Sequence, residues 1–467
     1  MDRRVATLLA MTDLCRPSLT HFSNRMTTKM TTKKTVGSKP FTHVNVVKVY
    51  LWQLHIGSVG LDPKYGFYVF NYTEEFIQSG IEPSPLQMPL SEEGYIFTDL
   101  PEATYQRLPA MLSDSLPDDF GNALIDRYMA DRGVSSAKVT PLDRLAYMGN
   151  RAMGALKFQP KRGPESDKPT AIDLSSLVEQ ARKAVTGVMD DDEHTNAALR
   201  NIIDVGTSAG GARAKAVIAW NPISDEIRSG QLDAPNGFEQ WLLKFDGLDK
   251  HRKLGSSQSY GRVEYAYHLM ARDAGIHMTD CRLLKENGRA HFMTRRFDRE
   301  ENGDRNHMQT LCAMSHLDFK KKGTNAYSQL FSTMVQLKLP YEAMEEAFRR
   351  MVFNVMGRNC DDHAKNFSFL LREGSATWEL SPAYDVTFAY DPTNEWISQH
   401  LMSVNGKFKD FERRDLLAEA DRFKIGTANK VIEKVRNAIK QWPRFAELAG
   451  LPEDEMVERQ NYLLPLD

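Results

Sequence analysis

The chain has 467 residues, more than one hydrophobic core usually organises, so its length predicts two or three domains or one bilobal enzyme. Hydrophobic residues make up 41% of the chain and charged residues 26%, which is ordinary for a globular protein. The formal net charge of −2 excludes a strongly basic nucleic-acid-binding chain, although local basic patches remain compatible with it.

Four cysteines, Cys15, Cys281, Cys312 and Cys360, are far apart and form no C-x-x-C pair. This spacing argues against a disulfide scaffold or a zinc ribbon and fits a reducing compartment. No apolar run approaches the roughly 18 to 20 residues that span a bilayer. We therefore expect a cytoplasmic protein without a membrane partner.

Residues 1–40 are polar and basic and repeat Met-Thr-Thr-Lys at Met26 and Met30, which predicts a disordered leader. Residues 41–150 are expected to form an N-terminal subdomain. A first strand is predicted from Val44 to Leu51, and a turn at Gly57 to Gly60 is expected to lead into a second. A third, aromatic strand is predicted from Tyr65 to Tyr72, so the three suggest a small antiparallel sheet or partial barrel. Apolar spacing predicts helices over residues 122–132 and 141–149 and a strand over 154–158.

Residues 151–299 are expected to form a kinase-like N-terminal lobe. After a predicted helix from Ile172 to Val188, the stretch T-S-A-G-G-A-R-A-K-A-V-I-A-W spans Thr207 to Trp220. Protein kinases cover ATP phosphates with such Gly-rich backbone, whose N–H groups hold oxygens without side chains in the way. The stretch is not a Walker A sequence, and a hairpin turn is the alternative interpretation.

Lys244 lies in the predicted strand W-L-L-K-F, as the phosphate-binding Lys of kinases lies in V-A-I-K. Glu264 follows about twenty residues later in a predicted helix, where kinases place the Glu that pairs with this Lys. A charge in an apolar strand normally needs a partner or ligand. The alternative is an edge-strand Lys that faces water.

Paired strands are predicted over residues 281–284 and 291–297, and they end in T-R-R-F-D-R, the expected hinge. Beyond Glu300 the apolar spacing is helical, most clearly over residues 341–357 and 431–442. Residues 300–467 are therefore expected to form a helical lobe that only the catalytic hairpin interrupts.

The most informative stretch runs from Asn359 to Asp385: N-C-D-D-H-A-K-N-F-S-F-L-L-R-E-G-S-A-T-W-E-L-S-P-A-Y-D. Asp361 and Asn366 have the D-x-x-x-x-N spacing of a kinase catalytic loop, in which the Asp meets the substrate hydroxyl and the Asn holds Mg²⁺. Asp361 is expected to be the catalytic acid rather than Asp362, because only Asp361 has this separation from the Asn. Two apolar runs around a Glu-Gly-Ser turn then predict a β-hairpin, and Asp385 follows it.

Two other interpretations of this stretch are open. Asp361 and Asp362 could cap a helix, with His363 on the surface and Asp385 in a turn, since Asp favours caps and turns. Cys360, Asp361 and His363 could instead bind a metal, but a structural zinc site needs about four ligands in paired spacings. The order of five features favours the kinase interpretation: Gly-rich stretch, strand Lys, helix Glu, D-x-x-x-x-N and an Asp after a hairpin.

These motifs resemble those of the HipA family of bacterial serine/threonine kinase toxins, from about residue 43 to the C-terminus. The resemblance rests on L-S-D-S-L-P-D-D-F-G, T-P-L-D-R-L-A-Y-M-G, T-S-A-G-G-A-R-A-K, W-L-L-K-F, R-R-F-D-R, D-D-H-A-K-N-F-S and S-P-A-Y-D. It implies an α+β, kinase-like bilobal fold, with an N-terminal α/β part that bears a small β-barrel and an all-α C-terminal lobe.

By position, the resemblance implies the following site residues: catalytic Asp361, His363 and Lys365, Mg²⁺ ligands Asn366 and Asp385, and ATP-binding Lys244, Glu264, Ser208, Ala209, Gly210, Gly211 and Ala212. Ser208 also stands where the family phosphorylates itself. Family loops often have the sequence G-A-Q-x-K, whereas this chain has G-G-A-R-A-K, so the role of Arg213 is open while Lys215 keeps its place.

The resemblance implies an ATP- and Mg²⁺-dependent protein serine/threonine kinase that arrests growth, as in persistence, until a dimeric helix-turn-helix antitoxin of HipB type restrains it. Operator DNA would be contacted mainly through the antitoxin. One family member acts on glutamate-tRNA ligase, which makes that enzyme a candidate substrate. A small-molecule phosphotransferase and a catalytically weak corepressor of a DNA-bound antitoxin are the alternatives, and the retained Lys, Asp and Asn argue against the second.

Overall fold

The computed structural model describes residues 41–117, 119–164, 173–186, 214–230, 234–247 and 259–466, without the side chains of residues 180 and 182–186. The leader predicted over residues 1–40 and the Gly-rich residues 207–213 lie outside these ranges. Within them, no helix has the length and apolar character needed to cross a membrane.

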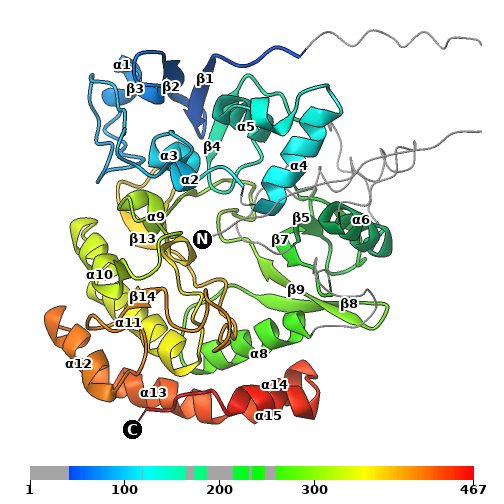
Figure 1. The fold of residues 1–467 in the computed structure, drawn as a ribbon, viewed down its shortest axis with the longest axis vertical. Helices are drawn as coiled ribbons and strands as arrows, with labels where there is room; N and C mark the ends of the chain where they lie inside the picture. The colour runs from blue at the N-terminus through cyan, green and yellow to red at the C-terminus, as the bar shows by residue number, and fades with distance from the viewer. Residues whose placement is uncertain are drawn as a thin grey trace, which may run out of the picture. The chain divides into compact units, whose positions relative to one another are not determined.

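A four-stranded antiparallel sheet begins the described chain (Figure 1). Its strands are β1 (Val46–Leu51), β2 (Leu54–Asp62), β3 (Phe67–Tyr72) and β4 (Leu156–Gln159), in the order β3-β2-β1-β4. The barrel implied by the resemblance is not formed by the described residues, because the edge strands β3 and β4 do not pair with each other. Four strands are also few for a closed sheet, since even the small barrels have about eight.

The turn predicted from Gly57 to Gly60 is wrong, because β2 continues through both glycines. The chain reverses earlier, at Trp52, whose φ of 55° is left-handed, and Leu51 pairs with Leu54 across the turn. Gly57 serves the sheet instead: a Cβ atom there would lie 2.2 Å from the backbone oxygen of Asn71 on β3. Glycine at this position thus permits a close approach between strands.

Helices connect β3 to β4: α1 (Glu74–Ile77), α2 (Glu102–Tyr105), α3 (Ala110–Ser113), α4 (Asp119–Ala130), the 3₁₀ turn η1 (Ser136–Lys138) and α5 (Pro141–Met148). The sequence sets the start of α5 by a capping box, in which the Thr140 hydroxyl accepts from the Asp143 N–H and the Asp143 carboxylate accepts from the Thr140 N–H. Asp143 also accepts from the Val44 N–H at 2.9 Å, so the cap anchors the chain just before β1.

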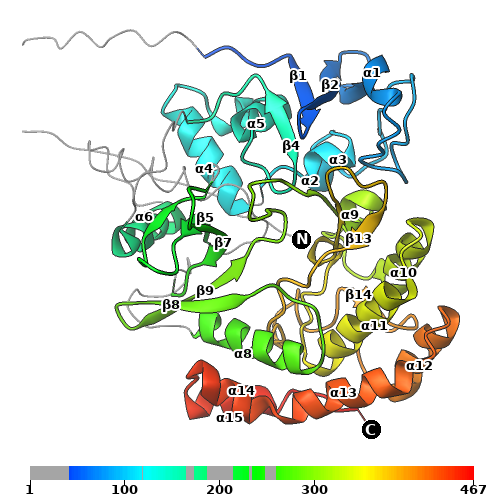
Figure 2. The ribbon, with the colours of Figure 1, turned by 180° about the vertical axis from the view of Figure 1, so that it is seen from behind.

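A five-stranded antiparallel sheet follows, in the order β6-β5-β7-β9-β8. Its elements and those around it are α6 (Leu174–Thr186), β5 (Lys215–Trp220), β6 (Ile227–Ser229), β7 (Glu239–Lys244), α8 (Tyr260–Asp273), β8 (Cys281–Glu286) and β9 (Arg289–Arg295). Helix α8 packs against β8 and β9, as Figure 2 shows from behind. The sequence predicted strands at β7, β8 and β9 but not the short strand β6.

The remaining helices are α9 (Leu311–Met314), α10 (Tyr327–Gln336), α11 (Tyr341–Met356), η2 (Ala364–Asn366), α12 (Arg413–Arg422), α13 (Ala428–Lys440), α14 (Trp442–Ala449) and α15 (Glu453–Gln460). Five strands lie among them: β10 (His307–Thr310), β11 (Asn325–Ala326), β12 (Ser368–Leu371), β13 (Trp378–Leu380) and β14 (Met402–Ser403). The all-α expectation is therefore wrong. The predicted hairpin exists as β12 and β13, but β10 pairs with β12 to make a three-stranded sheet, and β11 pairs with β14.

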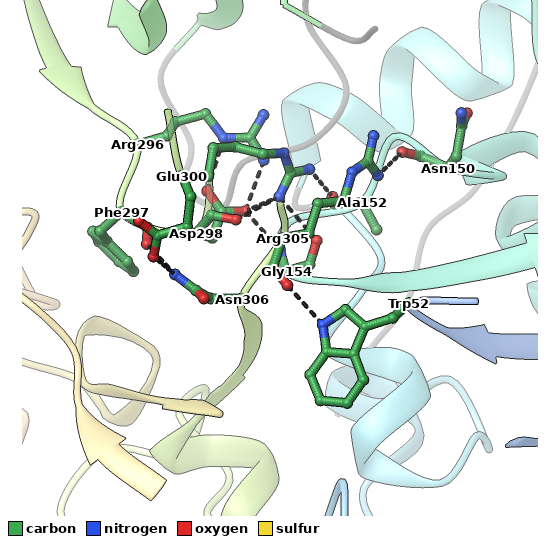
Figure 3. Close-up of polar contacts among 11 residues, drawn as sticks. Trp52, Asn150, Ala152, Gly154, Arg296, Phe297, Asp298, Glu300, Arg305 and Asn306 are labelled. Carbon is green, nitrogen blue, oxygen red and sulfur yellow. Dashed lines mark hydrogen bonds and ion pairs between the residues drawn. The ribbon is translucent and has the colours of Figure 1, made fainter. Parts of the chain in front are cut away.

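A buried carboxylate joins the first sheet to the chain that follows the second (Figure 3). Asp298 has no exposed side-chain surface and accepts hydrogen bonds from Arg296 Nε at 2.9 Å, Arg296 Nη2 at 2.7 Å and Arg299 Nη1 at 2.8 Å. It also accepts from the Gly154 N–H at 2.7 Å, just before β4. A buried carboxylate requires such partners, and here they fix the junction.

Backbone carbonyls of residues 150–154 accept from the same arginine-rich linker (Figure 3). Arg299 donates to Gly154 O at 3.0 Å and to Ala152 O at 3.2 Å, and Arg305 donates to Asn150 O at 2.6 Å. The indole of Trp52 donates to Arg305 O at 2.7 Å. The linker is thus held at several points by the first sheet and its neighbours.

We expect Asp298→Asn to lower the free energy of unfolding by about 3–5 kcal/mol, because the guanidinium groups of Arg296 and Arg299 would lose a buried carboxylate. Denaturant unfolding measures this loss. Glu102→Gln is the matched control, since it breaks a pair with Arg107 whose side chains are 61% and 46% exposed. That control should change the free energy by less than about 1 kcal/mol, and equal losses in both variants would contradict the assignment.

Candidate functional site

Three charged side chains from distant parts of the chain meet at one point. Lys244 ends β7, Glu264 lies in α8, and Asp385 follows β13. The Lys244 ammonium forms ion pairs with Glu264 Oε1 and, at 2.5 Å, with Asp385 Oδ1. The lysine side chain is 12% exposed, Glu264 4% and Asp385 30%, so the pair with Glu264 is the inner one. The sequence predicted this Lys–Glu pairing.

The cations around Asp385 keep it ionised. Burial by itself would raise the pKa of Asp385, but the charges of Lys244 and Lys215 outweigh burial and lower the pKa to about 2. Burial likewise lowers the pKa of Lys244, and the carboxylates of Asp385 and Glu264 more than reverse this. Lys215 is buried and stands opposite Lys244 in the register of β5 and β7. The site therefore holds fixed charges of both signs.

The Asp361 side chain is 42% exposed and accepts from the Trp396 indole N–H at 3.1 Å. Desolvation raises the pKa of this carboxyl, while His363 and the Trp396 hydrogen bond act in the opposite direction. His363 Nε2 lies 3.9 Å from Asp361 Oδ1. Asn366 Nδ2 donates to the backbone oxygen of Asp361 at 2.7 Å, so the two residues of the D-x-x-x-x-N motif hold each other in place.

Asp362 has the opposite environment, since its side chain is fully buried. It accepts hydrogen bonds from the Tyr327 hydroxyl, His400 Nδ1 and the Leu401 N–H, each at 2.8 Å. Of the two adjacent carboxylates, only Asp361 is available to a substrate. The geometry thus agrees with the choice made from spacing.

Two cavities adjoin this cluster, and both are lined by Asp361 and Asp385. The larger has a volume of about 570 Å³ and is further lined by Lys215, Lys244 and Glu264. The smaller has a volume of about 150 Å³, and its apolar lining residues are Leu116, Met153, Leu242, Phe297 and Met308. The two cavities thus share two carboxylates, and the smaller one combines apolar side chains with charged ones such as Arg296 and Lys365.

The smaller cavity is also lined by residues that the sequence analysis did not name as site residues. Phe297 and Tyr384 lie on its wall with ring centroids 5.6 Å apart, and the Tyr384 hydroxyl donates to Lys365 O at 2.6 Å. Both residues stand inside quoted motifs, R-R-F-D-R and S-P-A-Y-D, so the sequence contained a signal for them. The sequence contained no signal for Trp396, because it lies 35 residues after Asp361 and outside every quoted motif.

The residues present fit a magnesium ion bound together with phosphate. Asn366 and Asp385 both line the smaller cavity. Because the amide nitrogen of Asn366 donates to Asp361 O, its side-chain oxygen is the atom that could bind a metal, together with the Asp385 carboxylate. Mg²⁺ prefers such oxygens and usually takes only one or two protein carboxylates, with phosphates and water completing its shell. Asn366 and Asp385 would therefore hold the ion.

The other predicted site residues have different surroundings. Lys365 lies with its ammonium 5.0 Å from the ring centroid of Phe319, and the His363 ring packs on the same phenylalanine. Both residues also line the smaller cavity. The predicted phosphate-binding residues Ser208 to Ala212 lie outside the described ranges.

Two protein-family models match this chain, each over a different part of it. Residues 47–159 match the HipA N-terminal domain, and residues 207–442 match the HipA-like C-terminal domain. The chain belongs to the HipA family. The resemblance seen in the motifs is thereby confirmed.

Individual HipA proteins are distant in sequence. The serine/threonine-protein kinase toxin HipA of Shewanella oneidensis is 22% identical over 386 residues, which cover 78% of this chain and 79% of the relative. A solved complex of HipA, HipB and operator DNA from Shewanella oneidensis MR-1 matches with a TM-score of 0.64 and 19% identity, covering 90% of this chain and 96% of that chain. The chain is thus a homologue of a serine/threonine-protein kinase toxin, with the mixed α+β fold of a HipA structure.

A second solved structure, the proinflammatory kinase CtkA of Helicobacter pylori, has a TM-score of 0.31 and 12% identity. It covers 49% of this chain and 89% of its own chain.

We expect the ion pair between His400 and Asp362 to make stability depend on pH. Burial disfavours the charged ring, but the Asp362 carboxylate outweighs burial and raises the pKa of His400 to about 10. The unfolded value is about 6.5, so the stabilising contribution is complete below about pH 6.5 and is lost as the pH rises through about 10. Denaturant unfolding of wild type and His400→Gln should differ at about pH 7 and converge towards about pH 10. A difference independent of pH would contradict this.

Proposed function

We propose that this chain is an ATP- and Mg²⁺-dependent protein serine/threonine kinase and the toxin of a HipA/HipB-like toxin-antitoxin module. The observation that carries the proposal is the ion-paired group of Lys244, Glu264 and Asp385 beside the exposed carboxylate of Asp361. These are the parts that kinases use to position ATP and to meet a substrate hydroxyl.

Each residue has a role that follows from its surroundings. Lys244, kept cationic and held by Glu264, would bind nucleotide phosphate, and Asn366 with Asp385 would hold the metal, which neutralises developing charge on the phosphates. Asp361 would accept the hydrogen bond of the substrate hydroxyl and orient it for attack. Lys365 would support the transferred phosphate from the cavity wall.

The smaller cavity supports ATP as the ligand. Its apolar side chains and the aromatic rings of Phe297 and Tyr384 suit a purine base, since aromatic rings stack on bases of any sequence. The larger cavity offers Lys215 and Lys244 to the phosphates. We therefore assign the base to the apolar part of the smaller cavity, and the phosphates to the side where Asp361 and Asp385 line both cavities.

The domain boundaries proposed for this kinase follow the sequence: a leader over residues 1–40, an N-terminal subdomain over 41–150, a kinase-like lobe over 151–299 and a helical lobe over 300–467. The Gly-rich stretch from Ser208 to Ala212 would cover the ATP phosphates, as in other kinases.

A dimeric helix-turn-helix antitoxin is the proposed cytoplasmic partner, because the solved HipA relative is a complex with HipB and operator DNA. The net charge of −2 gives this chain little of the counterion release that drives nonspecific DNA binding, so contact with DNA would run mainly through the antitoxin. Tight, salt-sensitive DNA binding by the chain alone would contradict this. The protein substrate, with glutamate-tRNA ligase as one candidate, is to be found by mass spectrometry of a lysate incubated with labelled ATP.

We expect Asp361→Asn to lower phosphoryl transfer by about 10³-fold or more, because both orientation of the hydroxyl and acceptance of its proton would be lost. Binding of Mg·ATP, measured by calorimetry, should stay close to wild type. Lys244→Ala and Asp385→Ala should instead weaken Mg·ATP binding.

The contrast between the variants decides the assignment. Unchanged affinity in both Lys244→Ala and Asp385→Ala would exclude this nucleotide site. Transfer to small molecules but not to any protein would favour a small-molecule phosphotransferase. A wild type without transfer that still strengthens operator binding by the antitoxin would favour the corepressor.

We expect wild type incubated with Mg·ATP to gain one phosphate at Ser208 and then to bind ATP less tightly. A phosphoserine carries a charge of about −1.5 to −2 and would compete with nucleotide phosphates for the N–H groups of the Gly-rich stretch. Peptide mapping locates the phosphate, and Asp361→Ala should gain none. Modification at Thr207 instead, or undiminished ATP binding by the phosphorylated protein, would exclude this switch.

A further inference from the structure

A chain of buried hydrogen bonds runs from Asp362 in the candidate catalytic loop to the backbone of Asp385. The Tyr327 hydroxyl donates to Asp362 at 2.8 Å and accepts from Asn354 Nδ2 at 3.0 Å. Asn354 Oδ1 accepts from Asn359 Nδ2 at 3.0 Å, and Asn359 Nδ2 lies 3.5 Å from Asp385 O. Segments that carry the two key carboxylates are thereby joined through side chains of α10 and α11.

The three hydrogen bonds between Asn359 and Asp362 point the same way. Asn359 donates to Asn354, Asn354 to Tyr327 and Tyr327 to Asp362, so the carboxylate sets the orientation of these three side chains in turn. Asn359 Nδ2 also faces the other way, towards Asp385 O. The exposed fractions of Tyr327, Asn354 and Asn359 are 0%, 6% and 3%, which shields the chain from competition by water. Hydrogen bonds in such a low-dielectric series polarise and strengthen one another.

The elements at both ends of the chain fix its position. Tyr327 is the first residue of α10 and directly follows β11, which pairs with β14. Leu401, just before β14, and Met402, its first residue, donate their N–H groups to Asp362 at 2.8 and 3.4 Å. At the other end, Asp385 has a left-handed backbone with φ of 54°, a conformation that a non-glycine residue keeps only with support from its surroundings.

We propose that Tyr327, Asn354 and Asn359 form a positioning relay that sets the catalytic carboxylate of Asp361 at its working distance from the metal-binding Asp385. The relay deepens the proposed kinase function and rests on it. None of its members touches either cavity; they act through Asp362, the neighbour of Asp361, and through the Asp385 backbone. The relay is matched to a reaction that needs the two carboxylates in one fixed arrangement.

A purely structural role makes a different prediction. Satisfying buried polar groups would stabilise the fold but would leave the turnover of each folded molecule unchanged. A positioning role lowers kcat and leaves Mg·ATP affinity nearly unchanged when the relay is broken at Tyr327, because Tyr327 contacts Asp362 and contacts neither Lys244 nor Asp385.

The test compares Tyr327→Phe with Tyr72→Phe. Both tyrosines are buried and lose only a hydroxyl, but Tyr72 lies in β3 and donates to Met88 O at 2.8 Å, in the first sheet. Both variants are measured at a temperature where they are folded. Tyr327→Phe should lower kcat about tenfold or more, because one catalytic group would be mispositioned. Its Kd for Mg·ATP should stay within about twofold of the wild-type value. Tyr72→Phe should leave both unchanged.

A double variant adds a second criterion. If the relay acts as one unit, the double variant of Tyr327→Phe and Asn354→Leu should lower kcat no further than the worse single variant.

Equal activity of Tyr327→Phe and Tyr72→Phe, or losses that multiply in the double variant, would overturn the relay. Should Tyr327→Phe not fold, Asn354→Leu alone decides through the same split between kcat and Kd. A wild type without transfer in this assay would overturn the kinase function and the relay with it, whereas an active wild type beside an equally active Tyr327→Phe overturns the relay only.

Discussion

The carboxylate of Asp298 is excluded from water at the point where the first sheet, the second sheet and the following chain meet. Its desolvation has to be offset by charges held in place, and Arg296 and Arg299 supply them. Those guanidinium groups are themselves buried, so their remaining N–H groups also need acceptors, and carbonyls of Ala152 and Gly154 serve Arg299. One buried charge thus dictates the arrangement of segments that are more than 140 residues apart.

The same constraint reaches the functional site. Phe297 stands between Arg296 and Asp298 in sequence and lines the smaller cavity, and Met153 lines it from the segment that binds Arg299. The positions of Phe297 and Met153 on the wall of the smaller cavity therefore depend on the ion pairs of Asp298 with Arg296 and Arg299. The N-terminal part of the chain is in this sense a component of the proposed nucleotide site and more than a separate attachment.

Motifs with a fixed spacing could be predicted from sequence, because their chemistry requires residues at those separations. Lys244, Glu264, Asp361 and Asp385 fall in this class, and the structure brings them together. The turn at Gly57 was mispredicted because a glycine needed for close packing resembles a glycine needed for a turn. Strand β10 was missed because pairing with β12 across about 60 residues, and not local pattern, makes it a strand. Tyr327 and Asn354 are also invisible to motif analysis, since only the fold brings them to Asp362.

Asp361 and Asp362 show how adjacency in sequence can transmit rigidity. The Asp361 side chain must stay open to a substrate, so it can have few contacts of its own, and among the described residues the Trp396 indole donates to it. Asp362 is free of that requirement and is held by Tyr327, His400 and two backbone N–H groups. Because one peptide bond joins the two residues and has no freedom about its C–N axis, fixing the second limits where the first can go. Burial of Asp362 can thus restrict the position of Asp361 while the Asp361 carboxylate stays exposed to a substrate.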